Sequence, residues 1–421
     1  MNLNLTPYDQ ALLHGEHGPA AQHAMSIMTR MVGIYGTNSL LDITAAHIDS
    51  SLYMGDATLE FAERLANSGA KVKVPSTLNV SGVDEHHWQE WSTPPDHARK
   101  AHRQMVAYQN MGCIPTWTCA PYQTEHRPRF GQQIAWGESN AIAFANTVIG
   151  ARTERYPDLL DICAAITGRV PAAGLHLEEN RAGQFVIRID KIPLKLQEDD
   201  SFYPVLGHWI GKISGDQIPI VEGIKINPTE DQLKSFCAAM ASSSALGLCH
   251  IVGVTPEAAT LKEACQGKFL QRSVELDMSQ LREARDELTT TKTDQLDMVV
   301  LGSPHFSFAE FKKLVPLIKN RRCHSKVQFL VTTSRAMKEL ADRANFLTPL
   351  QEFGGKITVD TCIITTPMLP PEIKTLMTNS AKYAFYTPSL LNKQIAFGST
   401  EDCVHSAISG FIIRDDSLWE K

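Results

Sequence analysis

The chain has 421 residues, and its 40 Lys and Arg against 46 Asp and Glu give a formal net charge of −6. At roughly 150 residues per domain, this length predicts two or three domains. The mild acidity argues against a dedicated nucleic-acid-binding protein, which would carry a basic excess. No apolar run approaches the roughly 20 residues that span a bilayer, and residues 1–10 lack the pattern of a secretory signal. We therefore expect a cytoplasmic protein without nucleic-acid or membrane partners.

Helical and strand-like segments alternate along the first part of the chain. Pro7 and Pro19 each stand where the first residue of a helix is expected. Asp56 can cap an amphipathic helix that ends near Gly69, and residues 71–74 then read as a strand. This alternation is typical of α/β proteins.

The segment 136–140 (WGESN) is dense in polar groups and runs into an apolar helix over 141–148. Glu138, Ser139 and Asn140 are of the kinds that cap helices, so capping alone explains them. The functional alternative is an anion site at the helix N-terminus that receives a substrate carboxylate. Arg152 follows on the same stretch and could hold a carboxylate with two hydrogen bonds.

The middle of the chain differs. Residues 184–226 contain FVIRI, FYPVLGHWIG and IPIVEGIKI with Gly and Pro between them, which predicts a more β-rich region. The strand and helix rhythm returns afterwards, with strands over 297–301, 327–331 and 356–359. Ser307 and Glu310 form a capping box that opens a helix, and Ser334 starts another. Such a succession predicts a parallel sheet, with ligands beyond the carboxyl ends of its strands.

The nine cysteines contain no CxxC pair, so neither a zinc ribbon nor a ferredoxin-type cluster is indicated. Most fit the behaviour of reduced, buried thiols that pack as small apolar side chains. Cys119, Cys362 and Cys403 differ, because each stands beside turn-forming or polar residues, and loop cysteines on a rigid scaffold are better candidates for metal binding.

Two further polar segments read as strand-end loops: residues 74–79, which end in Asn79, and residues 378–382, which include Ser380 and Lys382. The second is equally explained as a solvated loop. Signature motifs for dinucleotides, nucleotide triphosphates, zinc proteases and lipases are missing. Residue chemistry alone therefore stops at an α/β enzyme with a possible thiolate-bound metal.

Several strings, taken in order, resemble the aconitase X family in its large-subunit portion. They are LLHGEHGPAAQHAM, VPSTLN, TCAPY, GESNAIAFANTVIGAR, TGRVPAAGLHLEENR, HIVGVTPEA, LGSPHFS, VTTSRA, DTC, TNSAKYAFYTPSL and EDC, which run from the first helix to about residue 410. The resemblance implies an aconitase-like α/β fold, with three α/β domains of parallel or mixed sheets around a cleft. We place these domains at residues 1–180, 181–290 and 291–421. The swivelling domain that closes the cleft is expected to be absent from this chain and supplied by a small subunit.

The resemblance further implies a cysteine-bound iron centre, either an iron–sulfur cluster such as [2Fe–2S] or a single iron. Carried over by motif, Cys119, Cys362 and Cys403 are the expected ligands. Ser303 departs from the family, because archaeal-type members have Cys-Pro-His where this chain has Ser-Pro-His at 303–305. A ligand there is lost or replaced by a weaker oxygen ligand, which favours the bacterial, hydroxyproline branch.

The activity that the resemblance implies is dehydration of cis-3-hydroxy-L-proline, a small hydroxy acid, to Δ1-pyrroline-2-carboxylate. Expected catalytic residues are Glu138 and Lys382, and expected substrate contacts are Asn79, Ser139, Asn140, Arg152 and Ser380. The base that removes the α-proton is expected on the small subunit. The alternatives are dehydration of mevalonate 5-phosphate, a non-catalytic iron- or RNA-binding relative, and a purely structural subunit with inert thiols.

Overall fold

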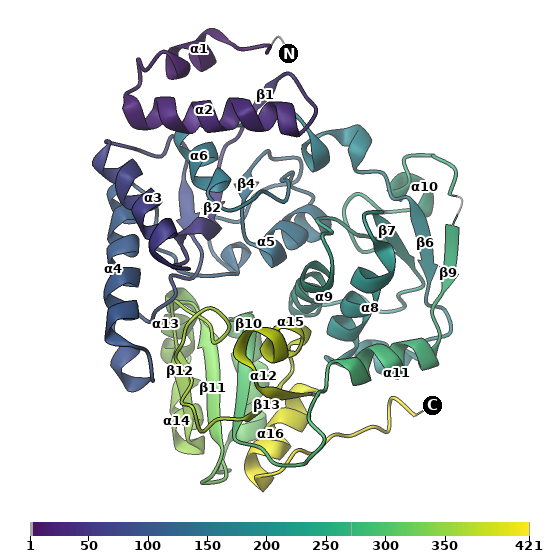
Figure 1. The fold of residues 1–421 in the computed structure, drawn as a ribbon. Helices are drawn as coiled ribbons and strands as arrows, with labels where there is room; N and C mark the ends of the chain where they lie inside the picture. The colour runs from purple at the N-terminus through teal and green to yellow at the C-terminus, as the bar shows by residue number, and fades with distance from the viewer. Residues whose placement is uncertain (1–2, 271, 421) are drawn as a thin grey trace.

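Three parallel β-sheets, each covered by helices, carry the part of the chain described by the computed structural model, residues 3–270 and 272–420 (Figure 1). The N-terminal region lies at the top of Figure 1, the middle region at the right, and the C-terminal region below. The predicted α/β class is therefore confirmed. No helix in the described part of the chain is long and apolar enough to cross a membrane.

The first region is built on a three-stranded parallel sheet in the order β3-β2-β4, with a two-stranded antiparallel pair of β1 and β5 beside it. Its strands are β1 Leu40–Asp42, β2 Ala46–Ile48, β3 Ser76–Leu78, β4 Ala135–Trp136 and β5 Arg169–Pro171. Its helices are α1 Pro7–Leu13, α2 Pro19–Ile34, α3 Asp56–Asn67, α4 Pro95–Asn110, α5 Ser139–Phe144 and α6 Leu160–Thr167. Both helix starts at a proline are confirmed.

The strand expected over residues 71–74 is wrong. The backbone N–H groups of Val72 and Lys73 donate to the carbonyls of Met111 and Ala165, which belong to the ends of two helical segments rather than to a neighbouring strand. The ladder begins only at Ser76. The apolar pattern of a short segment does not tell whether its extended backbone pairs with a neighbouring strand or bonds to the ends of helices.

The middle region has a four-stranded parallel sheet in the order β8-β7-β6-β9. Its strands are β6 Phe185–Arg188, β7 Pro219–Glu222, β8 His250–Ile251 and β9 Arg272–Glu275. Its helices are α7 Leu194–Glu198, α8 Phe202–Ser214, α9 Glu230–Ser243, α10 Leu261–Ala264 and α11 Met278–Glu287.

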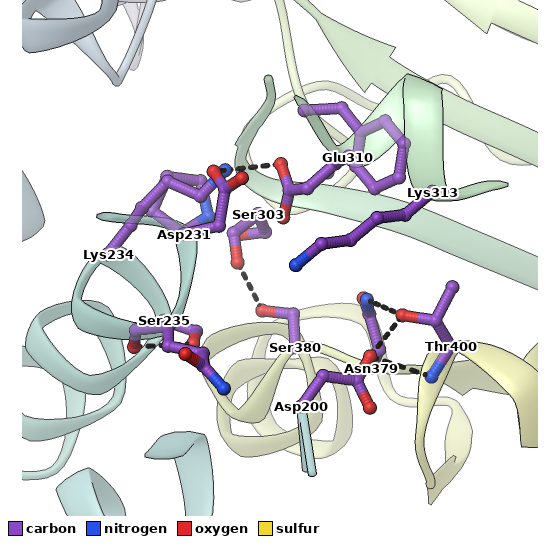
Figure 2. Close-up of a pocket in the computed structure, with 14 residues that line it drawn as sticks. Asp200, Asp231, Lys234, Ser235, Ser303, Glu310, Lys313, Asn379, Ser380 and Thr400 are labelled. Atoms are coloured by element: carbon purple, nitrogen blue, oxygen red, sulfur yellow. Dashed lines mark hydrogen bonds and ion pairs between the residues drawn. The ribbon is translucent and has the colours of Figure 1, made fainter. Parts of the chain in front are cut away.

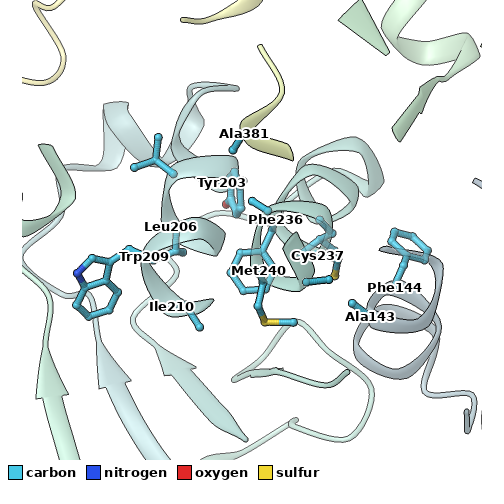
Figure 3. Close-up of a cluster of buried hydrophobic side chains, with 14 of the residues drawn as sticks. Ala143, Phe144, Tyr203, Leu206, Trp209, Ile210, Phe236, Cys237, Met240 and Ala381 are labelled. Carbon is cyan, nitrogen blue, oxygen red and sulfur yellow. The ribbon is translucent and has the colours of Figure 1, made fainter. Parts of the chain in front are cut away.

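The sequence predicted a β-rich region over residues 184–226, and this is wrong for the segment FYPVLGHWIG, which forms helix α8. The helix is apolar on nearly all sides because it is buried within the structure, and such a helix has no polar face to reveal its period. Figure 3 shows α8 packed against α9, with Phe236 and Met240 of α9 facing Leu206 and Ile210 of α8.

The third region has a five-stranded parallel sheet in the order β12-β11-β10-β13-β14. Its strands are β10 Met298–Phe306, β11 Gln328–Thr333, β12 Gly355–Thr358, β13 Thr375–Thr378 and β14 Gln394–Phe397. Its helices are α12 Phe308–Ile318, α13 Arg335–Arg343, α14 Leu347–Phe353, α15 Ala381–Tyr386 and α16 Thr400–Ser409. The predicted parallel strands, the capping box of Ser307 and Glu310 and the helix start at Ser334 are confirmed.

Polar contacts hold the first and third regions together. Arg335 at the start of α13 pairs with Asp360 of its own region and with Glu85 of the first region. The backbone N–H of Ser81 donates to the carbonyl of Asp360 over 2.8 Å. These contacts fix the strand ends of the two regions opposite each other, which is where a ligand site is expected.

Candidate active site

Three side chains follow the carboxyl ends of the three parallel strands in the first region. Asp49 comes directly after β2, Asn79 directly after β3, and Glu138 two residues after β4. Because these strands are parallel, their carboxyl ends meet at one edge of the sheet. All three side chains line one cleft, and concave sites of this kind are where small molecules usually bind.

The opposite wall of this cleft comes from the third region. Ser303 lies in the bend of β10, Cys362 in the loop after β12, and Lys382 in the first turn of α15 after β13. The full lining is Asp49, Leu52, Asn79, Val80, Cys119, Glu138, Ser139, Gly302, Ser303, Cys362, Ile364, Thr365, Lys382, Tyr386 and Leu390. The expected residues Asn79, Cys119, Glu138, Ser139, Cys362 and Lys382 are thus brought together.

An ion pair between Glu138 and Lys382 joins the two walls across the cleft. Both side chains are largely buried. Burial opposes the charge on Lys382, but the Glu138 carboxylate beside it more than offsets that effect and raises the pKa of the ammonium. Lys382 therefore stays protonated and can hold a substrate anion.

Glu138 is also the N-cap of α5, as its sequence context allows. Its carboxylate accepts a hydrogen bond from the backbone N–H of Ala141 over 2.8 Å and one from the side-chain amide of Asn140. Asn140 lies behind Glu138 and outside the cleft lining, and it also donates to the carbonyl of Cys119 over 3.0 Å. The predicted substrate contact at Asn140 is thus replaced by a supporting one.

Two of the three expected metal-binding cysteines share the cleft. Cys119 is buried, and its sulfur accepts a hydrogen bond from the backbone N–H of His305 over 3.2 Å. Burial raises the pKa of the Cys119 thiol to about 12, with a further contribution from Glu138. Cys362 is half-buried, and its sulfur lies 3.3 Å from the hydroxyl of Thr365.

His305 is itself held between the two regions. Its Nε2 donates to the carbonyl of Thr361 and its Nδ1 accepts from the hydroxyl of Thr118, each over 3.1 Å. Burial lowers the pKa of this imidazole to about 4, so the ring is neutral near pH 7. The ring contacts and the backbone N–H that reaches Cys119 together tie His305 to both regions.

The structure does not bring Cys403 to this cleft. The segment around it forms helix α16, opened by a capping box between Ser399 and Asp402, where the sequence analysis expected a loop. The Cys403 side chain is fully buried in the apolar core of the third region, against neighbours such as Val404 and Ala407. Among the described residues, no group of three or more His, Cys, Asp and Glu side chains is arranged to hold a metal ion.

Two other expected substrate contacts also lie elsewhere. Arg152 pairs with Glu178 at the surface of the first region and is not part of the cleft lining. Ser380 caps α15 and donates its hydroxyl proton to the carbonyl of Ser303 (Figure 2), and it is not part of the cleft lining. Ser380 therefore supports the segment that carries Ser303 without facing the cleft.

Sequence reasoning did not single out Asp49. The signal was present, since the apolar stretch before it is a strand and Asp49 stands at its carboxyl end. Burial raises the pKa of the Asp49 carboxyl well above its usual value, with further contributions from Glu138, Asp158 and Asp161. A carboxyl group so perturbed inside a cleft is a candidate functional group.

Comparison with known proteins agrees with this fold. Family models for the first, second and third domains of aconitase X match residues 2–179, 183–286 and 296–409. The crystal structure of Thermococcus kodakaraensis aconitase X in its holo-form is similar, with a TM-score of 0.86 and 32% identity, covering 96% of this chain and 100% of that one. The chain belongs to the aconitase X family.

The curated relatives bear names that give an activity. A cis-3-hydroxy-L-proline dehydratase from Pseudomonas aeruginosa is 44% identical, over 96% of this chain and 70% of that protein. One from Hypocrea jecorina is 43% identical, over 98% of this chain and 70% of that protein. A phosphomevalonate dehydratase large subunit from Methanocaldococcus jannaschii is 36% identical, over 94% of this chain and 98% of that protein. This chain is accordingly an enzyme of the dehydratase class, the hydro-lyases.

Proposed function

We propose that this dehydratase removes water from cis-3-hydroxy-L-proline. Loss of the α-proton and of the 3-hydroxyl gives one water and an enamine, which tautomerises to Δ1-pyrroline-2-carboxylate. The charge of the cleft carries the proposal, because its lining holds the carboxyl groups of Asp49 and Glu138 against the single ammonium of Lys382. An amino acid with a ring ammonium and one carboxylate suits this balance.

Mevalonate 5-phosphate suits the same cleft less well. It carries a phosphate and a carboxylate and no cation, so it would bring several negative charges against two carboxyl groups. Phosphate sites in proteins usually offer several cations or backbone N–H groups, whereas Lys382 is the one Lys or Arg in the described lining. The higher identity to the two hydroxyproline dehydratases points the same way.

Lys382 is the proposed partner of the substrate carboxylate. Its ammonium has three protons, of which one goes to Glu138. Glu138 accepts from Lys382, Ser139, Asn140 and Ala141, so its part is to hold Lys382 charged and in place. This arrangement lets the cleft grip the carboxylate while the α-carbon stays open to a base.

An iron ion is the proposed cofactor, with Cys119, Cys362 and Ser303 as its protein ligands. All three side chains line the cleft and provide two thiols and one hydroxyl. A [2Fe–2S] cluster usually takes four cysteines, so this donor set fits a single iron better. When bound, iron would act as a Lewis acid toward the departing hydroxyl.

We further propose a small subunit of the swivelling type as partner. The relative from Methanocaldococcus jannaschii is named a large subunit. Leu390 lines the cleft and leaves 59% of its surface exposed, and the partner would cover it there. The partner would exclude water and contribute the base that takes the α-proton.

The test is turnover of cis-3-hydroxy-L-proline by the iron-loaded protein with its partner, for the wild type and Lys382→Met. Loss of a charged hydrogen bond to the substrate predicts a decrease in kcat/KM of about 10- to 100-fold. Lys374→Met is the matched control, since Lys374 is exposed and lies outside the cleft. Wild-type activity in Lys382→Met would overturn the role of this residue.

A further inference from the structure

Two neighbouring side chains in the cleft lining, Asp49 and Asn79, each have an acceptor oxygen without a donor among the described residues. Asn79 donates its side-chain N–H to Oδ1 of Asp49. The carbonyl oxygen of the same side chain, Oδ1 of Asn79, is buried and has no hydrogen-bond partner among residues 3–270 and 272–420. A buried acceptor without a partner is costly, so it calls for a donor that the protein alone does not supply.

Asp49, beside it, also has an acceptor oxygen without a partner. Its Oδ1 accepts from Asn79, and within the described chain no side chain or backbone group donates to its Oδ2. Asp49 and Asn79 both line the cleft. Glu138 differs, because four donors already occupy its two oxygens. The acceptors open to a ligand on this wall are therefore on Asp49 and Asn79.

The backbone holds this pair firmly in position. The N–H of Asp49 donates to Asp161 over 2.6 Å, and the N–H of Asn79 donates to the carbonyl of Ile48 over 3.0 Å. Gly137 on the neighbouring strand end leaves the space for Asp49, since a Cβ at Gly137 would lie 2.8 Å from the Cβ of Asp49. The two acceptors are thus preorganised by adjacent parallel strands.

We infer that Asp49 and Asn79 recognise the ring ammonium of the substrate, with Oδ2 of Asp49 and Oδ1 of Asn79 accepting its two N–H protons. The inference rests on the proposed function, because the protonated ring nitrogen of a hydroxyproline offers two N–H donors and one positive charge. Lys382 on the opposite wall then takes the carboxylate. The pair makes the enzyme selective for amino acids over hydroxy acids that lack nitrogen.

Charge agrees with this assignment. Burial and the neighbouring Glu138 raise the pKa of Asp49, which is a cost of keeping that carboxylate ionised. A cation bound at Asp49 lowers the pKa and removes part of this cost. A ligand without the ammonium gains nothing there and leaves the acceptor of Asn79 unpaired.

The experiment compares two ligands that differ only at the ring atom: L-proline and (S)-tetrahydrofuran-2-carboxylate, in which oxygen replaces N–H. Their dissociation constants are measured by calorimetry on the complete enzyme. We expect the wild type to bind L-proline about 10- to 100-fold more tightly, as for a hydrogen bond to a charged group. Equal affinity of the wild type for the two ligands overturns the inference without need of any variant.

Two variants then locate the selectivity. Asp49→Asn and Asn79→Leu should each reduce the preference for L-proline and leave the affinity for the ether ligand nearly unchanged. In turnover, KM for cis-3-hydroxy-L-proline should rise more than kcat falls. Asp96→Asn is the control that keeps the wild-type preference, because the Asp96 side chain is exposed on helix α4. Asn79→Leu remains decisive if Asp49→Asn does not fold.

The outcomes separate the two claims. Turnover of cis-3-hydroxy-L-proline together with an unchanged ligand preference in both variants refutes the role of Asp49 and Asn79 and leaves the proposed function standing. An enzyme that does not turn over this substrate at all refutes the proposed function, and the inference falls with it.

Discussion

At the scale of the residue, the cleft depends on which cysteines face it. Cys119 and Cys362 line the cleft, whereas Cys403 is enclosed in the apolar core of the third region. The same side chain therefore has two different energetic roles in one protein. A thiol that faces a polar cleft is available as a ligand, and a thiol among Val and Ala side chains contributes only packing.

This difference predicts opposite results for two serine substitutions. Cys119→Ser should lose most of the bound iron and the activity while the protein stays folded. Cys403→Ser should keep iron and activity and lose about 1–3 kcal/mol in the free energy of unfolding, because a hydroxyl replaces a thiol in an apolar core. Iron content by atomic emission and urea unfolding measure the two effects. If Cys403→Ser lost its iron while Cys119→Ser kept it, Cys403 would have to be an iron ligand and Cys119 would not.

His176 gives a prediction for acid stability. The imidazole is buried and hydrogen-bonded to Gln133 over 2.6 Å, and burial lowers its pKa from 6.5 to about 3. Between about pH 3 and pH 6.5, His176 is therefore protonated in the unfolded chain and neutral in the folded protein. This contribution to stability is complete above about pH 6.5 and is lost as the pH falls toward 3.

The corresponding measurement is urea unfolding of the wild type and of His176→Gln between pH 7 and pH 4. The variant should be less stable at pH 7, because the native hydrogen bonds are disturbed, and its stability should fall less steeply as the pH decreases. Parallel curves for the two proteins would show that His176 does not contribute to the pH dependence.

At the scale of the element, the packing of α8 against α9 requires a small residue at the crossing. A Cβ at Gly207 of α8 would lie 2.3 Å from the carbonyl oxygen of Phe236 in α9. Gly207 therefore permits the close approach that Figure 3 shows around Phe236 and Leu206. Interiors are close-packed, so the helices must separate to admit any side chain there.

We predict that Gly207→Ala lowers the free energy of unfolding by about 1–3 kcal/mol, as expected for overpacking. The control is Gly33→Ala in α2, where an added Cβ meets nothing within 4 Å. Alanine there should stabilise the helix by about 0.5–1 kcal/mol. Thermal and urea unfolding test both variants, and a destabilised Gly33→Ala with an unaffected Gly207→Ala would contradict the packing argument.

The parts that sequence predicted are those in which local signals agree with tertiary structure. Capping residues such as Ser307 and Ser334 marked helix starts because they bond to the backbone of their own turn. Helix α8 was misread because burial on all sides removes its polar face. Cys403 was misplaced since a helix start and a polar loop share the same residue types. Asp49 acquires its place only when three strands align.

At the scale of the whole molecule, the site exists only because two regions face each other. Asp49, Asn79 and Glu138 come from the first sheet, and Ser303, Cys362 and Lys382 from the third region. The pair of Arg335 with Glu85 and the pair of Glu138 with Lys382 span the boundary. Segments far apart in the sequence thereby form one cleft, which a single region would not contain.

The measurement that tests the central claim most directly is a comparison of two substrates on the same preparation. The iron-loaded protein with its partner subunit is given cis-3-hydroxy-L-proline and mevalonate 5-phosphate in parallel, and kcat/KM is determined for each. The balance of two carboxyl groups and one ammonium in the cleft predicts conversion of cis-3-hydroxy-L-proline to Δ1-pyrroline-2-carboxylate and no measurable dehydration of the phosphate. Dehydration of mevalonate 5-phosphate with cis-3-hydroxy-L-proline left unchanged would contradict the account.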